Sequence, residues 1–347
     1  MTDDAGLLAA MRRAVEVSTE VLGTTSPNPP VGAVVLDEHG DVVGEGATQP
    51  PGSPHAEVMA LRQAGHRAHT VVVTLEPCDH TGRTGPCTEQ LIGADVKRVV
   101  IACAEPTALA GGGVERLRDA GVEVLSGVLE AEVAAGPLAA WLHRQVSGRP
   151  YVTWKYAATL DGRSAAADGS SRWITGEAAR ADVHRLRAQS DAIVVGVGTV
   201  LVDDPSLTAR PDPGHQPLRV VLDSSGRTPA TAKVLDDAAP TLVVTTGPSY
   251  GDDRTLVLGE HDLDGLMKAL DERGIVSILL EGGPTLAGAF LRAGLVDRVI
   301  GFVAPALLGA GLTALGDAGV GTIDQAIRLR LVDVTRLGDD LRLTMEP

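Results

Sequence analysis

Aromatic residues are scarce in this sequence, and cysteines are few. Phe, Trp and Tyr together account for only 2% of the 347 residues, so the core must be filled by Ala, Val, Leu and Ile. Three cysteines in so long a chain exclude a fold built on a framework of disulfides. We therefore expect free or metal-bound thiols and a cytoplasmic protein, because thiols stay reduced in that compartment.

The sequence also has fewer basic than acidic residues. Lys and Arg number 30 against 45 Asp and Glu, which gives a formal net charge of −15. A chain this acidic is not expected to bind nucleic acid, although a small anionic ligand needs only a few well-placed cations. No apolar run approaches the roughly 20 residues of a membrane span, and the opening MTDDAG lacks the basic region of a signal peptide. We therefore expect neither a nucleic-acid partner nor a membrane partner.

The length and the pattern of elements predict an α/β protein of two domains. At roughly 150 residues per domain, the chain is long enough for about two. The segment VSGRP at 146–150 is typical of a linker, and it places a first domain at 1–147 and a second at 151–347. In the first half, strands separated by helices indicate a largely parallel sheet with helices on both faces.

Individual elements can be placed from periodicity and turn residues. A first helix is expected to begin at Asp3 or Asp4 and end near Gly23, and a hairpin to follow with its turn at 38–41. The first half further predicts helices at 55–65, 88–93 and 114–120, and strands at 70–77, 98–104 and 122–125. The second half predicts strands at 151–159, 191–197, 218–223, 241–246, 277–283, 297–307 and 329–337, and helices at 177–189, 263–273 and 285–293.

The chemistry of the first half gathers in two short stretches, PHAEVMA and TLEPCDHTGRTGPCTE. The first puts His55 and Glu57 at the start of a helix. The second follows a strand, and Pro77 predicts that Cys78 lies in the first turn of another helix, where the helix N-terminus and a bound cation would favour its thiolate. With Cys87, this gives three zinc ligands and leaves a fourth position for water, as in a catalytic site.

An H-x-E motif followed by P-C and a further Cys is the signature of the zinc deaminases. In such a site the metal activates water, and Glu57 would carry its proton to the departing amine. A lone His or Cys is more often structural, but the combined motifs argue against a chance occurrence. The loop between the two ligand cysteines carries His80 and Arg83, which could reach a substrate phosphate. Cys103, in the apolar stretch RVVIACA, is interpreted as a core residue.

At these residues the chain resembles the bifunctional riboflavin-biosynthesis deaminase/reductase family. The similarity rests on SPNPPVGAVV, PHAEV and TLEPCDHTGRTGPC in the first half and on KYAATLDGR, SRWITG, GTVLVDDPSLTAR and LEGGPTLAGAFL in the second. It implies a cytidine-deaminase-like α/β/α domain followed by a dihydrofolate-reductase-like α/β domain. The implied reactions are zinc-dependent removal of the 2-amino group of a phosphoribosylaminopyrimidine, and then NADPH-dependent reduction of its ribosyl chain.

The resemblance implies roles for individual residues of the deaminase half. His55, Cys78 and Cys87 would bind Zn²⁺, Glu57 would carry the proton, and Asn28 in SPNP would contact the substrate.

The chain departs from the family around the implied deaminase pocket. Pro30 stands where family members often have Asn, and Thr48 stands where they often have His. Glu105 and Thr107 replace the ends of an Asp-Pro-Asn sequence. We therefore expect altered substrate binding together with retained zinc chemistry.

The second half lacks the G-x-G-x-x-G fingerprint of dinucleotide sites. Instead, a predicted strand runs into Gly282 and Gly283, and Pro284 and Thr285 open a helix. Glycines let backbone N–H groups approach an anion, and a helix N-terminus favours negative charge. From this string alone, a phosphate site and an ordinary Gly-Gly turn are equally well supported. The resemblance favours the first and places the pyrophosphate region of NADPH at this loop.

The resemblance also implies the contacts of the reductase half. Implied NADPH contacts are Ala157, Trp173, Thr199, Asp203, Ser224, Gly283, Pro284 and Thr285, and implied substrate contacts are Ser171, Arg187, Leu207, Arg210 and Glu281. From the sequence alone, a solvated position for Arg187 and a helix cap for Asp203 are the commoner interpretations. Lys155 shares a strand with Ala157 and could approach the reacting carbonyl. Asp161, in TLDGR, is a candidate polar organiser or a turn residue.

Two other functions fit the sequence less well. A zinc deaminase acting on another nucleoside or nucleotide, or on tRNA, is disfavoured by the net charge and by the second domain. A non-catalytic binding protein is disfavoured by the complete set of His55, Glu57, Cys78 and Cys87. The expected partner is a small-molecule phosphoribosylaminopyrimidine. The resemblance also implies a homo-oligomer, for which DRVIGFVAPALL is either an interface segment or a core strand.

Overall fold

The computed structural model describes residues 4–80, 85–107, 110–211, 214–247 and 254–347. The chain divides into two compact units, Met1–Arg149 and Pro150–Pro347, which are described separately. Across the described residues, every helix is too short or too polar to cross a bilayer.

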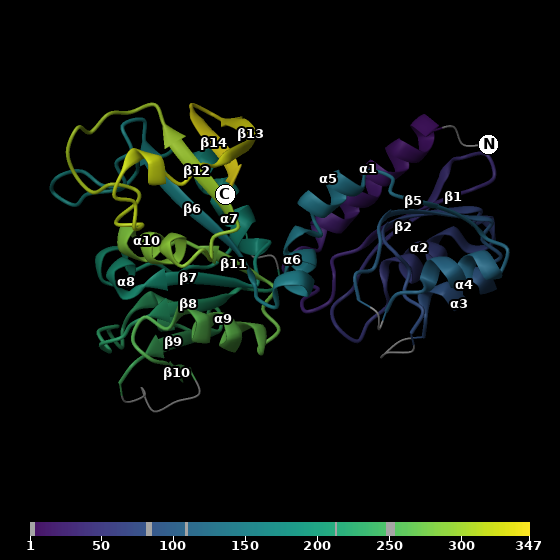
Figure 1. Ribbon diagram of the computed structural model, residues 1–347, viewed down its shortest axis with the longest axis horizontal. Helices are drawn as coiled ribbons and strands as arrows, with labels where there is room; N and C mark the ends of the chain where they lie inside the picture. Colours follow the sequence, from purple (N-terminus) through teal and green to yellow (C-terminus); the bar gives the residue numbers. More distant parts are fainter. Residues whose placement is uncertain (1–3, 81–84, 108–109, 212–213, 248–253) are drawn as a thin grey trace. The chain divides into compact units, whose positions relative to one another are not determined.

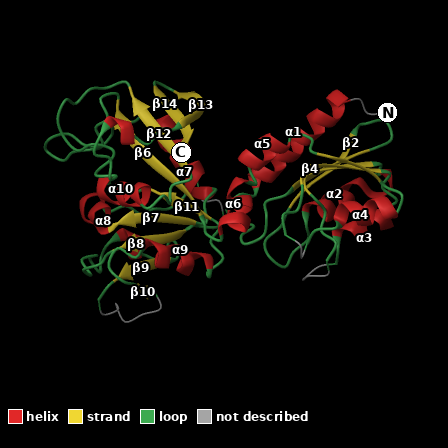
Figure 2. Ribbon diagram, viewed as in Figure 1, coloured by secondary structure: helices red, strands yellow, loops and turns green. Residues whose placement is uncertain are grey.

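The first unit is a five-stranded sheet with helices on both faces (Figure 1 and Figure 2). Its elements are α1 (Asp4–Glu20), β1 (Gly32–Leu36), β2 (Val42–Ala47), α2 (Ala56–Ala64), β3 (Thr70–Leu75), α3 (Cys87–Gly93), β4 (Arg98–Cys103), α4 (Gly113–Asp119), β5 (Glu123–Ser126), α5 (Glu130–Ala135) and α6 (Ala139–Ser147). The strand order is β2-β1-β3-β4-β5. In Figure 2, α1 and α5 lie over one face, and α2, α3 and α4 lie over the other.

The sheet is largely parallel, as predicted, and β1 is the described strand that runs opposite to the others. β3, β4 and β5 are parallel, but β1 runs antiparallel to both β2 and β3. Glycines let the helices approach these strands closely. A Cβ atom on Gly32 would lie 2.0 Å from the carbonyl oxygen of Ala14 in α1, and one on Gly44 would lie 2.2 Å from that of Ala60 in α2. A Cβ on Gly46 would lie 2.4 Å from the carbonyl oxygen of Ala56, so the start of α2, and with it His55, lies close to the sheet.

The second unit is a nine-stranded sheet in the order β10-β9-β8-β7-β11-β6-β12-β14-β13. Its elements are β6 (Tyr151–Thr159), α7 (Glu177–Ala188), β7 (Ala192–Gly196), α8 (Val197–Asp203), β8 (Leu218–Leu222), β9 (Thr241–Thr245), β10 (Thr255–Val257), α9 (Leu263–Asp271), β11 (Ser277–Leu280), α10 (Pro284–Arg292), β12 (Arg298–Ala304), β13 (Arg330–Leu337) and β14 (Asp340–Glu346). The seven strands from β10 to β12 are parallel, and β14 runs antiparallel to both of its neighbours.

The core of the second unit lies on both faces of this sheet. On one face, Leu266 and Leu270 of α9 and Phe290 of α10 pack against Val194 and Val220. On the other face, residues of α7 and α8 pack against the alternate side chains of β7 and β8. Because these strands are parallel, the carboxyl ends of β7, β8, β9 and β11 lie together at one edge of the sheet. This edge is the usual place for a ligand in such a fold.

The structure departs from the predicted elements in several places. α5, α8, β10 and β14 were not predicted, and α1 ends at Glu20 rather than near Gly23. The β-branched residues of α8 favour strands, which explains why it gave no helical signal. The apolar segment DRVIGFVAPALL contains β12, which pairs with β6 and β14 and is a core strand. Asp3 lies outside the described residues.

Candidate active sites

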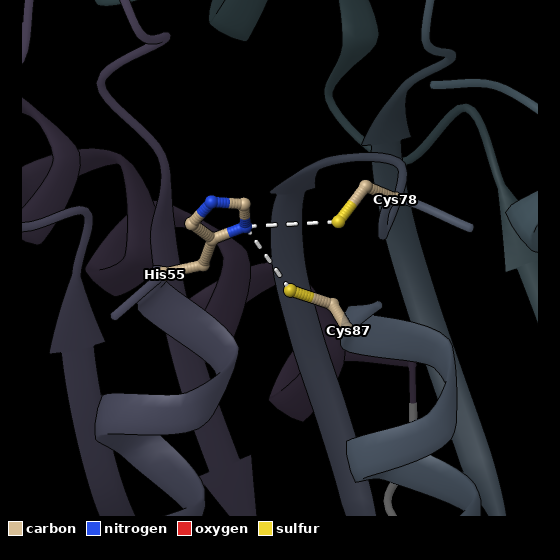
Figure 3. A group of neighbouring side chains, drawn as sticks. All are labelled: His55, Cys78 and Cys87. Atoms are coloured by element: carbon tan, nitrogen blue, oxygen red, sulfur yellow. Dashed lines mark hydrogen bonds between the residues drawn. The ribbon is translucent and has the colours of Figure 1, made fainter. Parts of the chain in front are cut away.

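One histidine and two cysteines come together in the first unit (Figure 3). His55 lies immediately before α2, Cys87 is the first residue of α3, and Cys78 lies in the loop after β3. The Nδ1 atom of His55 is 3.2 Å from the Sγ of Cys87 and 3.7 Å from the Sγ of Cys78. Their donor atoms all lie within 4.8 Å of one another. One imidazole and two thiolates are donors that zinc prefers, so the set fits this metal.

The prediction that Cys78 begins a helix was wrong. The loop after β3 does not become helical at Pro77, and the next helix begins at Cys87. The hydrogen bond with Cys87, and then the one with His55, lowers the pKa of the Cys78 thiol to about 4. Side-chain contacts therefore favour the thiolate at Cys78 in place of the helix N-terminus that the sequence had suggested.

Glu57 lies in the first turn of α2 and is only 4% exposed. Burial raises the pKa of this carboxyl group. Together with His55 and Cys78 it lines a cavity of about 400 Å³. A carboxyl group with a raised pKa beside a candidate metal site is suited both to accept and to deliver a proton.

Other residues singled out in the sequence line the same cavity, namely Asn28, Thr48, His80, Glu105 and Thr107. The hydroxyl of Thr48 accepts a hydrogen bond from the backbone N–H of Val31 at 3.1 Å, so it is partly committed to the protein. Nδ1 of His80 is buried and has no hydrogen-bond partner among the described residues. Arg83 lies outside the described residues.

Two further residues of the first unit, Pro30 and Glu76, are held by hydrogen bonds to other parts of the chain. Pro30 is buried, and its carbonyl accepts a hydrogen bond from Ser18. Glu76 lines the cavity but was not singled out. Its carboxylate accepts hydrogen bonds from the backbone N–H groups of Glu105 at 3.1 Å and Val114 at 3.0 Å. The sequence could have indicated Glu76 as a site residue, because it stands in the E-P-C motif.

In the second unit, Glu281 lies at the carboxyl end of β11 between two cations. Nε of Arg187 is 2.6 Å from one carboxylate oxygen of Glu281, and Nζ of Lys155 is 3.3 Å from the other. Burial by itself would raise the pKa of Glu281, but the charges of Arg187 and Lys155 outweigh it and lower the pKa to about 2. Arg187 is thus a largely buried ion-pair partner and not a solvated helix residue.

The Gly-Gly turn opens α10 as predicted. Gly283 caps the helix, Pro284 is its first residue, and a Cβ on Gly283 would lie 4.0 Å from Oγ1 of Thr199. Thr285 and Ser224 both line a cavity of about 740 Å³ at the carboxyl ends of the parallel strands. The structure therefore brings Thr199 to the turn, and Ser224 and Thr285 to one cavity.

The remaining candidate residues are less closely grouped. Nη2 of Arg172 donates to the carbonyl oxygen of Asp203 at 2.5 Å, which brings 171–173 near the end of α8. Trp173 is 70% exposed and lies under the guanidinium of Arg180 at 4.6 Å. Ser171 and Ala157 are partly exposed. Arg210 is exposed, and Leu207 is buried in the core.

Comparison with known proteins connects both units with one family. Residues 6–103 match the cytidine and deoxycytidylate deaminase zinc-binding region, and residues 150–343 match the RibD C-terminal domain. The riboflavin biosynthesis protein RibD of Mycobacterium tuberculosis H37Rv is 52% identical over 342 residues, covering 97% of this chain and 96% of the relative. RibD of Escherichia coli K12 is 42% identical over 360 residues, covering 96% of this chain and 97% of the relative.

Solved structures agree over nearly the whole chain. A diaminohydroxyphosphoribosylaminopyrimidine deaminase/5-amino-6-(5-phosphoribosylamino)uracil reductase from Thermotoga maritima matches with a TM-score of 0.91 and 36% identity, covering 99% of both chains. Acinetobacter baumannii RibD matches with a TM-score of 0.89 and 41% identity, also covering 99% of both chains. The chain therefore belongs to the RibD family of riboflavin biosynthesis proteins, with the deaminase region in its first half and the RibD C-terminal domain in its second.

Proposed function

We propose that this chain catalyses two successive reactions of riboflavin biosynthesis. The first is hydrolytic deamination of 2,5-diamino-6-(5-phosphoribosylamino)pyrimidin-4-one, and the second is NADPH-dependent reduction of the ribosyl chain to give 5-amino-6-(5-phosphoribitylamino)uracil. The observation that carries the proposal is the His55, Cys78 and Cys87 group beside the buried Glu57 in one cavity, in a chain that also matches the RibD C-terminal domain. The Thermotoga maritima relative is titled for both activities.

In the first unit, Nδ1 of His55 and the thiolates of Cys78 and Cys87 would hold Zn²⁺. When bound, zinc acts as a Lewis acid that activates water for attack on the carbon that bears the amino group. Glu57 would accept a proton from the attacking water and deliver it to the departing amine. The raised pKa of its buried carboxyl group supports this double task. Asn28 would contact the pyrimidine, since it lines the same cavity.

In the second unit, NADPH would supply the hydride. Gly283, Pro284 and Thr285 would hold the pyrophosphate region, because they form the N-terminus of α10 beside the 740 Å³ cavity. The further proposed cofactor contacts are Ala157, Trp173, Thr199, Asp203 and Ser224.

The substrate of the reductase would lie against Ser171, Arg187, Leu207, Arg210 and Glu281. Arg210 is exposed and suits the substrate phosphate, whereas Arg187 is bound to Glu281 and would orient that carboxylate. The side chain of Leu207 is buried, so its contact would be made through the backbone.

The experiment measures both half-reactions with the full chain. We expect about one zinc ion per chain by mass spectrometry. Ammonia should be released from the diamino substrate, and NADPH should be oxidised with either the diamino substrate or the deaminated intermediate. A chain that contains no zinc and releases no ammonia would contradict the deaminase. A chain that oxidises no NADPH with the intermediate would contradict the reductase.

The same proposal includes a homo-oligomer acting in the cytoplasm on a small-molecule substrate. β13 is an edge strand of its sheet, and its Leu331 and Val334 are exposed. An apolar edge strand is a common place for contact between copies. Sedimentation equilibrium measures the assembly, and a mass equal to one chain at micromolar concentration would contradict it.

A further inference from the structure

The cavity of about 740 Å³ extends from α10 past the ends of β7, β8 and β9. At one end lies Thr285, in the first turn of α10. At the other end, Leu258, Leu263 and Leu266 give it an apolar wall, and His261, Asp262 and Asp264 of the same stretch also line it. Because β8 follows β7 in the sheet, the turn after β8 lies between the pyrophosphate turn and this wall. An apolar wall suits an adenine ring, so the turn after β8 lies where the adenosine ribose would be.

In many dinucleotide sites, an acidic residue hydrogen-bonds the ribose 2′-hydroxyl of NAD, whereas an Arg accommodates the 2′-phosphate of NADP. Asp223 follows the end of β8 and is among the residues that line the cavity, but it is fully buried. It accepts hydrogen bonds from the backbone N–H groups of Arg227 at 2.9 Å and Thr228 at 2.7 Å, and from the Thr228 hydroxyl at 2.7 Å. Asp223 therefore shapes the turn and is not directed at a ribose.

The same turn presents Arg227 to the cavity. Its side chain is exposed, and no carboxylate of the described residues forms an ion pair with it. The other arginine that lines the cavity is different, because Nη1 of Arg292 is 3.1 Å from a carboxylate oxygen of Asp317. Ser224 lines the cavity with Arg227 and is held by the residue that follows β9, since the hydroxyl of Thr246 donates to its carbonyl oxygen at 2.8 Å.

We infer that Arg227, on the turn held by Asp223, is the residue that recognises the 2′-phosphate of NADPH and so selects NADPH over NADH. A guanidinium binds phosphate oxygens through paired, charge-assisted hydrogen bonds, and NADH has no phosphate at this position. Ser224 lines the same cavity and would add a further hydrogen bond. This inference rests on the proposed reductase function and names the group that gives it its cofactor preference.

The test is direct binding of cofactor to the full chain, measured by calorimetry without the reductase substrate. Arg227→Ala should weaken binding of NADPH by about tenfold or more, because a hydrogen bond to a charged group is lost. Binding of NADH should change by less than about twofold. The fragment 2′,5′-ADP should lose affinity in the same way as NADPH, whereas 5′-AMP should not. Arg227→Lys, which retains the charge, should keep part of the preference.

Arg292→Ala is the matched control, since it removes an arginine that lines the same cavity but is already paired with Asp317. It should leave the ratio of NADPH to NADH affinity unchanged. Loss of the preference in Arg292→Ala, or equal effects of Arg227→Ala on both cofactors, would overturn the inference. Tight NADPH binding unaltered by Arg227→Ala would overturn it while leaving the reductase function intact. A wild-type chain that binds neither cofactor would overturn both.

Discussion

Arg187 binds both carboxylate oxygens of Glu281 with two nitrogens of one guanidinium. Nε lies 2.6 Å from Oε1, and Nη2 lies 3.0 Å from Oε2. The two residues are 94 positions apart in the sequence. Lys155 reaches the same carboxylate from β6. The candidate substrate site of the reductase is therefore built on a largely buried cluster of two cations and one anion, in which Arg187 and Glu281 orient each other.

This cluster makes the stability of the second unit depend on Glu281. Glu281→Gln leaves Arg187 and Lys155 without their buried counter-ion, and should lower the free energy of unfolding by about 3 kcal/mol at pH 7. The pKa of Glu281 in the folded chain is lowered from 4.5 to about 2. The stabilisation is therefore complete above about pH 4.5 and declines as the pH falls toward 2. Urea unfolding of both proteins across this range measures it.

The control for Glu281 is an exposed ion pair in the same unit. Asp204 pairs with Lys233 at 3.2 Å on the surface, so Asp204→Asn should cost less than about 1 kcal/mol. If the gap between wild type and Glu281→Gln stayed constant from pH 7 to pH 2.5, the ionised carboxylate would not be the source of the stability.

Asp161 is predicted to support the cofactor site from a distance. Its carboxylate accepts hydrogen bonds from the backbone N–H of Gly309 at 2.6 Å and from Leu308, and so holds the segment after β12. Farther along that segment, the N–H of Gly316 donates to the carbonyl of Pro284 at the start of α10. Asp161→Asn should raise the KM for NADPH by roughly twofold to tenfold, the loss of about one hydrogen bond.

Steady-state kinetics with the deaminated intermediate measure the effect of Asp161→Asn. The matched control is Asp37→Asn in the first unit, where the carboxylate likewise accepts backbone N–H groups, those of His39 and Asp41, in a hairpin turn. It should leave the KM for NADPH unchanged. A normal KM in Asp161→Asn would restrict Asp161 to a local turn role.

Local sequence signals predicted most of the elements, the first hairpin and the largely parallel sheet, but not which strand lies beside β1. Runs such as TVVVTL and RVVIAC are strands because β-branched residues fit a buried sheet. The antiparallel pairing of β1 with β3 depends on contacts distant in the sequence, which periodicity does not contain. β14 could have been predicted, since Leu341, Leu343 and Met345 alternate with polar residues after Gly338.

The grouping of the candidate metal ligands was predictable because two short motifs contain them. The motifs place His55 just before one helix, Cys87 at the start of another and Cys78 in the loop after a strand, and their donor atoms lie together. The pairing of Arg187 with Glu281 was not predictable from spacing, since it depends on how α7 crosses the end of β11. The sequence likewise does not show that Leu207 is buried, or that Asp223 accepts hydrogen bonds from its own turn.

Removal of one thiol should empty the metal site. Cys78→Ala leaves His55 and Cys87, and two ligands are too few for tight zinc binding. The zinc content of the purified chain should fall from about one ion to a small fraction. Cys103→Ala is the control, because Cys103 is buried in β4 and is not among the grouped donors, and it should retain zinc. Full zinc content in Cys78→Ala would refute the ligand assignment.

Glu105 and Thr107 are predicted to set substrate affinity in the deaminase. Oε1 of Glu105 accepts hydrogen bonds from the backbone N–H of Thr107 at 3.1 Å and from its hydroxyl at 2.5 Å, and both residues line the cavity. Replacing them together with Asp and Asn shortens the carboxylate and changes the group beside it. The KM for deamination should change by roughly twofold to tenfold, while the KM for NADPH stays the same. An unchanged deaminase KM would show that neither side chain meets the substrate.

Glu57→Gln separates the two activities. The glutamine has nearly the same size and can still form hydrogen bonds, but it cannot accept a proton from the attacking water and deliver it to the amine. Ammonia release from the diamino substrate should fall by about 10²–10⁴-fold, the usual effect of losing an acid–base group. Zinc should stay bound, because Glu57 is not one of the three grouped donors.

The reductase provides the internal control for Glu57→Gln, because its proposed residues all lie in the unit Pro150–Pro347. Given the deaminated intermediate, the variant should oxidise NADPH at the rate of the wild type. Given the diamino substrate, it should oxidise almost none, since the intermediate is no longer formed. This difference between the two substrates distinguishes a lost proton carrier from a misfolded chain. A folded Glu57→Gln protein that also failed to reduce the supplied intermediate would contradict two independent active sites.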